Sequence, residues 1–177
     1  MRNDFNSFDS ILDKLNKQFK GTDESAMEQA YYIAHTYSSC KLCGVGKGVG
    51  AIIKKNDKII CFGYNGMVDH ITPCTKDTCL GITREEYYRK DRNICYGDCA
   101  EKRAFINAYK NKIDLSGTTI YITKSPCISC CKLIINLGIE EIVYDAIYSN
   151  YPNYEFSFEL LKEANIKHRL LKNNSLE

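Results

Sequence analysis

The sequence predicts a single α/β domain in which helices and strands form layers around a mixed sheet. The 177-residue chain is long enough for one hydrophobic core and leaves little room for a second. Its composition is that of an ordinary globular protein, with 44% hydrophobic and 26% charged residues. The apolar periodicity changes along the chain in the order α-β-β-α-β-α-β-α-β, which is typical of layered α/β proteins.

The first half of this order is a helix, a hairpin and a long irregular stretch. Residues 22–38 have an apolar helical face, and Thr22 or Asp23 can cap the helix. Residues 48–66, "GVGAIIKKNDKIICFGYNG", form two β-rich runs joined at residues 55–57 and predict a hairpin. Residues 67–98 have little periodicity. A loop of this length inside a compact domain is expected to be functional or fixed by other groups.

The second half alternates regularly between helices and strands. The expected elements are a helix at 99–110, a strand at 117–126, a helix at 127–138, a strand at 139–147, a helix at 153–165 and a strand at 166–171. Gly138 is a favoured residue for closing the helix that starts at Cys127.

Net charge and hydropathy argue against several functional classes. A formal charge of +2 provides no large basic field for nucleic acid. The chain has no apolar run near the length of a membrane span, and its first residues do not resemble a signal peptide. We therefore expect a cytoplasmic protein.

Ten cysteines are many for a chain of this size. Without a secretory signal we expect reduced thiols, and clustered thiols in a reducing compartment are usually metal ligands or catalytic groups. Nine of the ten occur in groups, whereas Cys61 stands alone in a strand and is expected to be a small buried hydrophobe.

Two helix starts carry the strongest chemical signal. Cys99 and Glu101 open one predicted helix, and Cys127 and Cys130 share one side of the first turn of another. Helix N-termini favour thiolates, so convergence of the two starts would fill three of zinc's four tetrahedral positions and leave one open. Two alternatives remain: a Cys127/Cys130 redox pair, and a closed structural zinc site with Cys95 or Cys131 as the fourth ligand.

The remaining cysteines suggest a second metal site. We expect Cys74, Cys79 and Cys95, together with Cys40 or Cys43, to bind a structural zinc ion that fixes the long loop, with His70 as an alternative ligand.

The motifs Cys99-Ala100-Glu101 and Pro126-Cys127-x-x-Cys130 resemble the signature of the zinc-dependent cytidine/deoxycytidylate deaminase superfamily. The segments "VGAIIKKNDKIICFGYNGM" and "IYITKSPCISCCKLIINLGIEEIVYD" are similar to the deoxycytidylate deaminases in particular. The resemblance implies a three-layer α/β/α fold with a five-stranded mixed sheet, in a domain spanning residues 22–172 after an N-terminal extension of residues 1–21. It also implies a homo-oligomer that acts in pyrimidine nucleotide metabolism.

The resemblance further implies a hydrolase that converts dCMP to dUMP and ammonia. Cys99, Cys127 and Cys130 would bind the catalytic zinc, and Glu101 would carry protons between water, N3 of the base and the leaving amine. The Ala100 N–H would bind the base carbonyl, Asn65 would face the sugar, and Tyr148 would contact the nucleotide. In the residues alone, Asn65 is equally well explained as a turn residue. Tyr148 is explained slightly better as a packing residue than as a substrate contact.

The sequence departs from the deoxycytidylate deaminase pattern at two positions. The first zinc ligand is Cys99 where these enzymes have histidine, and Val68 follows Met67 where a proline is usual. Cysteine at the first position is the pattern of free-nucleoside deaminases, so a cytidine or deoxycytidine deaminase is the first alternative. Two further alternatives are a deaminase of tRNA or single-stranded DNA and a non-catalytic, zinc-stabilised binding module. A deaminase that acts on a polynucleotide would need a basic, aromatic-lined groove.

Overall fold

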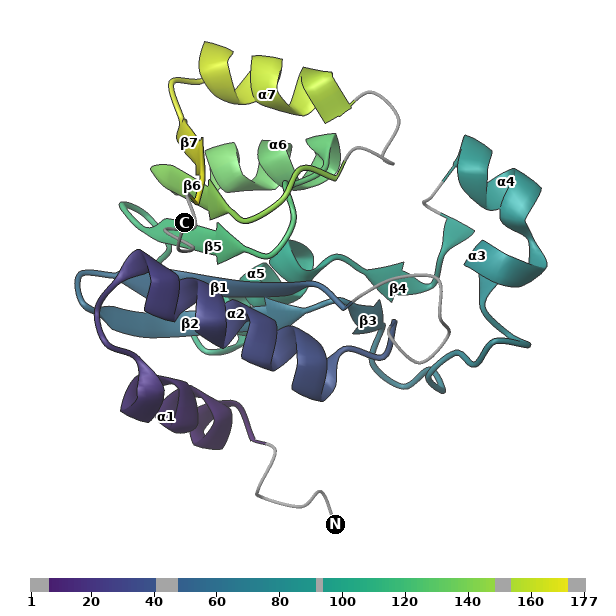
Figure 1. Ribbon diagram of the computed structural model, residues 1–177, viewed down its shortest axis with the longest axis horizontal. Coiled ribbons are helices and arrows are strands. Elements are labelled where there is room, and N and C mark those ends of the chain that lie inside the picture. The colour runs from purple at the N-terminus through teal and green to yellow at the C-terminus, as the bar shows by residue number, and fades with distance from the viewer. Residues whose placement is uncertain (1–6, 41–47, 92–93, 149–153, 172–177) are drawn as a thin grey trace, which may run out of the picture.

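The computed structural model describes residues 7–40, 48–91, 94–148 and 154–171 (Figure 1). Its helices are α1 (Phe8–Gln18), α2 (Asp23–Tyr37), α3 (Leu80–Thr83), α4 (Glu85–Lys90), α5 (Ala100–Lys110), α6 (Ile128–Asn136) and α7 (Tyr154–Glu163). Its strands are β1 (Gly50–Lys55), β2 (Lys58–Tyr64), β3 (Gly66–Met67), β4 (Gly97–Asp98), β5 (Thr119–Ile122), β6 (Glu141–Tyr144) and β7 (Lys167–Leu170). Within these residues, no helix combines the length and apolar character needed to cross a membrane.

A five-stranded mixed sheet forms the centre of the molecule, in the order β2-β1-β5-β6-β7. β1 pairs antiparallel with β2 and with β5, whereas β5, β6 and β7 run parallel. The predicted hairpin is confirmed: Asn56 adopts a φ of 54° in the turn between β1 and β2, a left-handed conformation that asparagine tolerates. The predicted mixed α/β sheet is therefore confirmed.

Helices cover both faces of the sheet, because alternate strand residues point to opposite sides (Figure 1). On one face, Ile52 and Tyr121 pack with the buried residues of α1 and α2. On the other face, Ile53 and Ile120 pack with buried residues of α5, α6 and α7. All four of these strand side chains are 1% exposed or less, so each face encloses its own core.

The N-terminal region holds a helix that the sequence analysis did not anticipate. In α1, Ile11 and Leu15 enter the core beneath α1 and α2, and Leu15 is fully buried. The Asn16 side chain also binds the backbone of β2: its Nδ2 donates to the Ile59 carbonyl at 2.9 Å, and its Oδ1 accepts from the Ile59 N–H at 3.0 Å. Residues 8–18 are therefore packed onto the sheet. A domain boundary at residue 22 stays a prediction.

The long stretch 67–98 contains more regular structure than expected. It begins in β3 and ends in β4, which pair antiparallel with each other, and α3 and α4 lie between them. The Arg103 side chain of α5 fixes the start of this stretch, since its Nη1 donates to the Met67 carbonyl at 2.6 Å and its Nη2 lies 3.6 Å from Asp69. The two ends of the stretch therefore meet beside the N-terminus of α5.

Candidate functional site

Three cysteine thiols meet at the N-terminal ends of α5 and α6. Cys99 and Cys127 are the N-cap residues of these helices, both with extended backbone, and Cys130 lies in the first turn of α6. The three sulfur atoms lie within 4.8 Å of one another, and no other group of three potential metal ligands is this close in the described part of the chain. The predicted convergence of the two helix starts is thus what the structure shows.

The close approach of α5 to β2 requires glycine at position 63. A Cβ atom at Gly63 would lie 2.2 Å from the Ala100 carbonyl oxygen and 2.4 Å from the Ala104 nitrogen. Such distances are impossible for any side chain without movement of the helix. Asn107 holds the same helix from its other end, because its Nδ2 donates to the Phe62 carbonyl at 3.0 Å. β2 therefore sets the position at which α5 begins.

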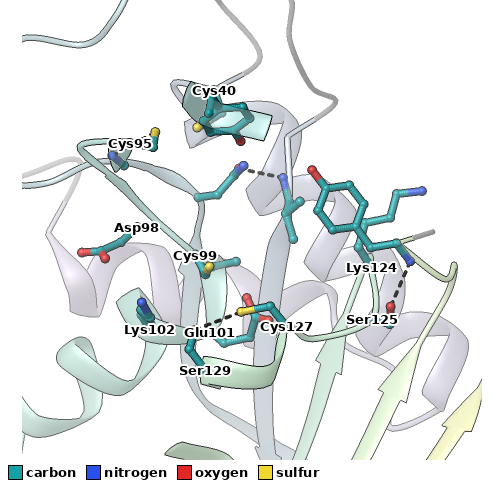
Figure 2. A pocket seen from close by; sticks show the side chains of 16 residues that line it. Cys40, Cys95, Asp98, Cys99, Glu101, Lys102, Lys124, Ser125, Cys127 and Ser129 are labelled. Atoms are coloured by element: carbon teal, nitrogen blue, oxygen red, sulfur yellow. Dashed lines mark hydrogen bonds between the residues drawn. The ribbon is translucent and has the colours of Figure 1, made fainter. Parts of the chain in front are cut away.

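Glu101 is buried beside the thiols, with only 4% of its surface exposed. Burial raises the pKa of its carboxyl group to about 8, and the negative charge of Cys127 contributes in the same direction. Figure 2 shows the Glu101 carboxylate directed toward the space beside Cys127 and Cys99. A carboxyl group that titrates near neutral pH next to an open metal position is suited to proton transfer.

The thiols share their protons unequally. Hydrogen bonds from Cys130 and Cys99 lower the pKa of Cys127 strongly, and the Ser129 hydroxyl lies 3.1 Å from the Cys127 sulfur. Cys99 donates a hydrogen bond to Cys127, which raises the pKa of the Cys99 thiol, and burial raises it further. The pKa of Cys130 is raised for the same reasons. Hydrogen bonding within the cluster therefore favours ionisation of Cys127 over that of Cys99.

This donor set fits zinc. Tetrahedral zinc with Zn–S bonds of about 2.3 Å places its sulfur ligands about 3.8 Å apart, which sulfurs within 4.8 Å reach by small adjustments. Burial lowers the pKa of Lys102, but the charges of Cys99, Cys130 and Cys127 outweigh burial and raise it overall. Lys102 thus offsets part of the negative charge that three thiolates would bring to the ion.

A pocket of about 250 Å³ opens above the cysteine cluster (Figure 2). Its lining includes Cys99, Glu101 and Cys127 at the base. Fully buried Cys130 lies behind these residues, outside the lining. A metal at the three sulfurs would therefore be accessible to a small molecule from the pocket side, as a catalytic site requires.

All three residues predicted to contact substrate lie in the lining of this pocket. Asn65 Oδ1 accepts hydrogen bonds from the Ser38 hydroxyl at 2.6 Å and from the Val49 N–H at 2.7 Å, which fixes the orientation of the amide. Ala100 is the buried first residue of α5, and Tyr148 is 37% exposed. The structure brings them together, while their contacts with substrate stay predictions.

The sequence analysis missed several lining residues: Tyr88, Lys124, Ser125 and Ser129. Ser125 has a clear structural role. Its N–H donates to the Ala146 carbonyl at 2.8 Å, and its hydroxyl accepts from the Tyr148 N–H at 2.9 Å. The only local signal for this structural role of Ser125 in the sequence is its position directly before the Pro-Cys-x-x-Cys motif.

The cysteines predicted to hold a second zinc do not gather into a three-ligand cluster where the structure describes them. Cys40 and Cys95 line the rim of the pocket, Cys74 is half-buried and Cys79 is buried. His70 is exposed, and Cys43 lies outside the described residues. The second ion therefore stays a prediction. Cys61 is fully buried as expected, and burial raises the pKa of its thiol to about 12.

The chain is similar to known proteins over most of its length. Residues 20–146 match the family profile described as the cytidine and deoxycytidylate deaminase zinc-binding region. ComE operon protein 2 of Bacillus subtilis is 32% identical over 118 residues, covering 67% of this chain and 57% of that protein. The deoxycytidylate deaminase of phage T4 is 29% identical over 166 residues, covering 76% of this chain and 84% of that protein.

A solved structure shares the fold. It is the dCMP deaminase of cyanophage S-TIM5 in complex with dCMP and dUMP, with a TM-score of 0.62, 22% identity, and coverage of 85% of this chain and 99% of that one. The predicted five-stranded α/β/α fold is thereby confirmed. The chain spans only 48% to 60% of the length of several cellular relatives. The family match over residues 20–146, together with the cysteine cluster that lies within this range, shows that the chain belongs to the cytidine and deoxycytidylate deaminase family.

Proposed function

We propose that this chain catalyses the hydrolytic deamination of dCMP to dUMP and ammonia, with one zinc ion held by Cys99, Cys127 and Cys130. The observation that carries the proposal is a buried carboxylate, Glu101, beside an open three-thiol cluster at the base of a pocket. A purely structural zinc site has no use for such a carboxylate. When bound, zinc supplies Lewis acidity that lowers the pKa of water toward neutrality.

Glu101 would carry the protons of the reaction. Its carboxylate would remove one proton from the water that attacks C4 of cytosine and deliver it to N3. It would then take the remaining proton from the new C4 hydroxyl group and deliver it to the departing amine. The pKa near 8 that burial produces suits a group that must both accept and release protons near neutral pH. One water is consumed, the C4–N bond breaks, and ammonia leaves.

The pocket provides groups that would orient the nucleotide. The Ala100 N–H at the start of α5 has no intrahelical acceptor and would bind the base carbonyl. The Ser38 hydroxyl and the Val49 N–H both donate to Oδ1 of Asn65, so Nδ2 of the same amide would donate to the sugar. Tyr148 would cover the nucleotide from the loop after β6.

The choice of dCMP is supported by relatives: the matching proteins of phage T4 and cyanophage S-TIM5 are both named as deaminases of this nucleotide. Cysteine at position 99 favours a free-nucleoside deaminase as the second candidate. By family likeness we further infer a homo-oligomer and a catalytic domain over residues 22–172. From the grouping of the remaining cysteines we infer a structural second zinc bound by Cys74, Cys79 and Cys95 with Cys40 or Cys43, and with His70 as an alternative ligand.

The first experiment measures ammonia release from dCMP, deoxycytidine and cytidine by the zinc-loaded protein and its Glu101→Gln variant. We expect dCMP turnover that falls by about 10²- to 10⁴-fold in the variant. Zinc content should stay unchanged, because Glu101 is not a ligand. The exposed Glu159→Gln serves as the matched control.

Two outcomes would contradict the proposal. Turnover of the nucleosides without turnover of dCMP would replace it with the second candidate. A Glu101→Gln variant with wild-type turnover would show that another group moves the protons.

A further inference from the structure

The pocket contains two lysines in different electrostatic situations. Lys102 lies close to the cysteine cluster and Asp98, whose charges raise its pKa against the effect of burial. Lys124 also lines the pocket, and like Lys102 it takes part in none of the ion pairs of the described residues. Unlike Lys102, it lies on the side of the pocket away from Asp98 (Figure 2). Lys102 is thus engaged in charge compensation at the metal centre, whereas the ammonium group of Lys124 is available to an incoming anion.

The backbone of Lys124 is held firmly. It lies two residues beyond the end of β5, the central strand of the sheet, and the next residue, Ser125, is joined by two hydrogen bonds to the loop that carries Tyr148. Lys124 itself is half-buried. Because the backbone is already held in place, only the flexible lysine side chain has to become ordered when its charge binds an anion in the pocket.

Lys124 and Lys102 lie on opposite sides of the reactive groups. In Figure 2, Cys99, Glu101 and Cys127 lie between Lys102 and Asp98 on one side and Lys124 and Ser125 on the other. A nucleotide whose base lies over Glu101 would reach Lys124 when its sugar extends away from the acidic side of the pocket.

We propose that Lys124 binds the 5′-phosphate of the nucleotide and thereby makes the pocket select pyrimidine nucleoside monophosphates over free nucleosides. The inference rests on the proposed function, because it requires the base to lie at Glu101. A phosphate brings nearly two negative charges into a pocket that already contains thiolates and a carboxylate, so it needs a cation other than Lys102. Lys124 meets this need without disturbing the metal centre.

The test measures binding of the products dUMP and deoxyuridine by calorimetry to the zinc-loaded wild type, Lys124→Met and Lys124→Arg. Lys132→Met, at an exposed lysine of α6 outside the pocket lining, is the matched control. We expect Lys124→Met to weaken dUMP binding by about 10- to 100-fold, the loss typical of a charge-assisted hydrogen bond, and to leave deoxyuridine binding unchanged. Lys124→Arg should retain most of the preference, and Lys132→Met all of it.

The inference is overturned if Lys124→Met keeps the wild-type ratio of dUMP to deoxyuridine affinity, or if the wild type itself binds both equally. Equal weakening of both ligands would assign Lys124 a general role in pocket shape and would also overturn it. Because product binding involves no turnover, a wild type that binds dUMP through Lys124 but does not deaminate dCMP would refute the proposed function alone.

Discussion

Substitution of Gly63 by alanine tests whether the contact between β2 and α5 sets the geometry of the metal centre. The new Cβ would lie 2.2 Å from the Ala100 carbonyl oxygen, so the helix must move by about 1.2 Å to reach an ordinary contact of 3.4 Å. Cys99 lies at the start of this helix and moves with it, whereas Cys127 and Cys130 belong to α6. Zinc–ligand bond lengths vary by only about 0.2 Å around their ordinary values, and a shift of the whole helix is harder to correct than rotation of a side chain.

The expected losses follow from this displacement. Overpacking of this kind costs about 1–3 kcal/mol of the free energy of unfolding. Displacement of Cys99 and Glu101 by about 1 Å should reduce kcat/KM for dCMP by about 100-fold. Zinc affinity should fall as well, which competition with a chromophoric chelator measures directly.

A second glycine separates displacement of the helix from general loss of stability. Gly117, in the turn before β5, has a φ of 70°, and a Cβ there would meet no atom closer than 3.8 Å. Gly117→Ala should cost about 1 kcal/mol through backbone strain alone. It should keep zinc affinity and turnover near wild type. If Gly63→Ala also keeps both within about twofold of wild type, β2 does not set the position of α5 and the reasoning fails.

Two further substitutions probe the sheet and the pocket. The Tyr121 hydroxyl donates to Asp23 at 2.7 Å, so Tyr121→Phe should lower the free energy of unfolding by about 1 kcal/mol at pH 7. Burial raises the pKa of Asp23, but hydrogen bonds from Tyr121 and Arg169 outweigh burial and leave the pKa below its ordinary value of 3.8. The stabilisation is therefore fully present above pH 3.8 and is lost as the pH falls through the lowered pKa. Urea titrations should show the stabilities of wild type and variant converging in acid, and a difference that stays constant with pH would contradict the assignment. Ser125→Ala removes the acceptor of the Tyr148 N–H. It should raise KM for dCMP about fivefold and lower the melting temperature by a few degrees. An unchanged KM would show that this hydrogen bond does not support substrate binding.

Each half of the cysteine cluster could be predicted from sequence because its geometry is local, whereas the convergence of the two halves was expected from the family resemblance. Cys99 with Glu101, and Cys127 with Cys130, each lie on one helical turn, and the spacing of residues along a helix fixes which side chains are neighbours. The hairpin of β1 and β2 was equally predictable, because it depends on a short turn that includes Asn56.

Features that depend on contacts between distant segments could not be predicted in this way. The start of the 67–98 stretch is held by Arg103, which lies 36 residues from the Met67 carbonyl it binds. The access of Lys124 to the pocket depends on the packing of β5 against β6 and on the loop beyond β6. Helix α1 was missed although local signals for it exist, since Ser7 caps it and Ile11 and Leu15 recur at helical spacing; its packing onto the sheet, by contrast, is visible only in the structure.

The amide of Asn16 acts as a substitute for a neighbouring strand. β2 lies at the edge of the sheet, and an exposed edge offers unpaired N–H and C=O groups to the strands of other molecules. Asn16 occupies both groups of Ile59, and Asn107 occupies the Phe62 carbonyl from α5. Helix α1 therefore protects the protein from edge-to-edge aggregation, and a shortened chain beginning at residue 22 would retain every group of the metal centre but lose much of this protection against self-association.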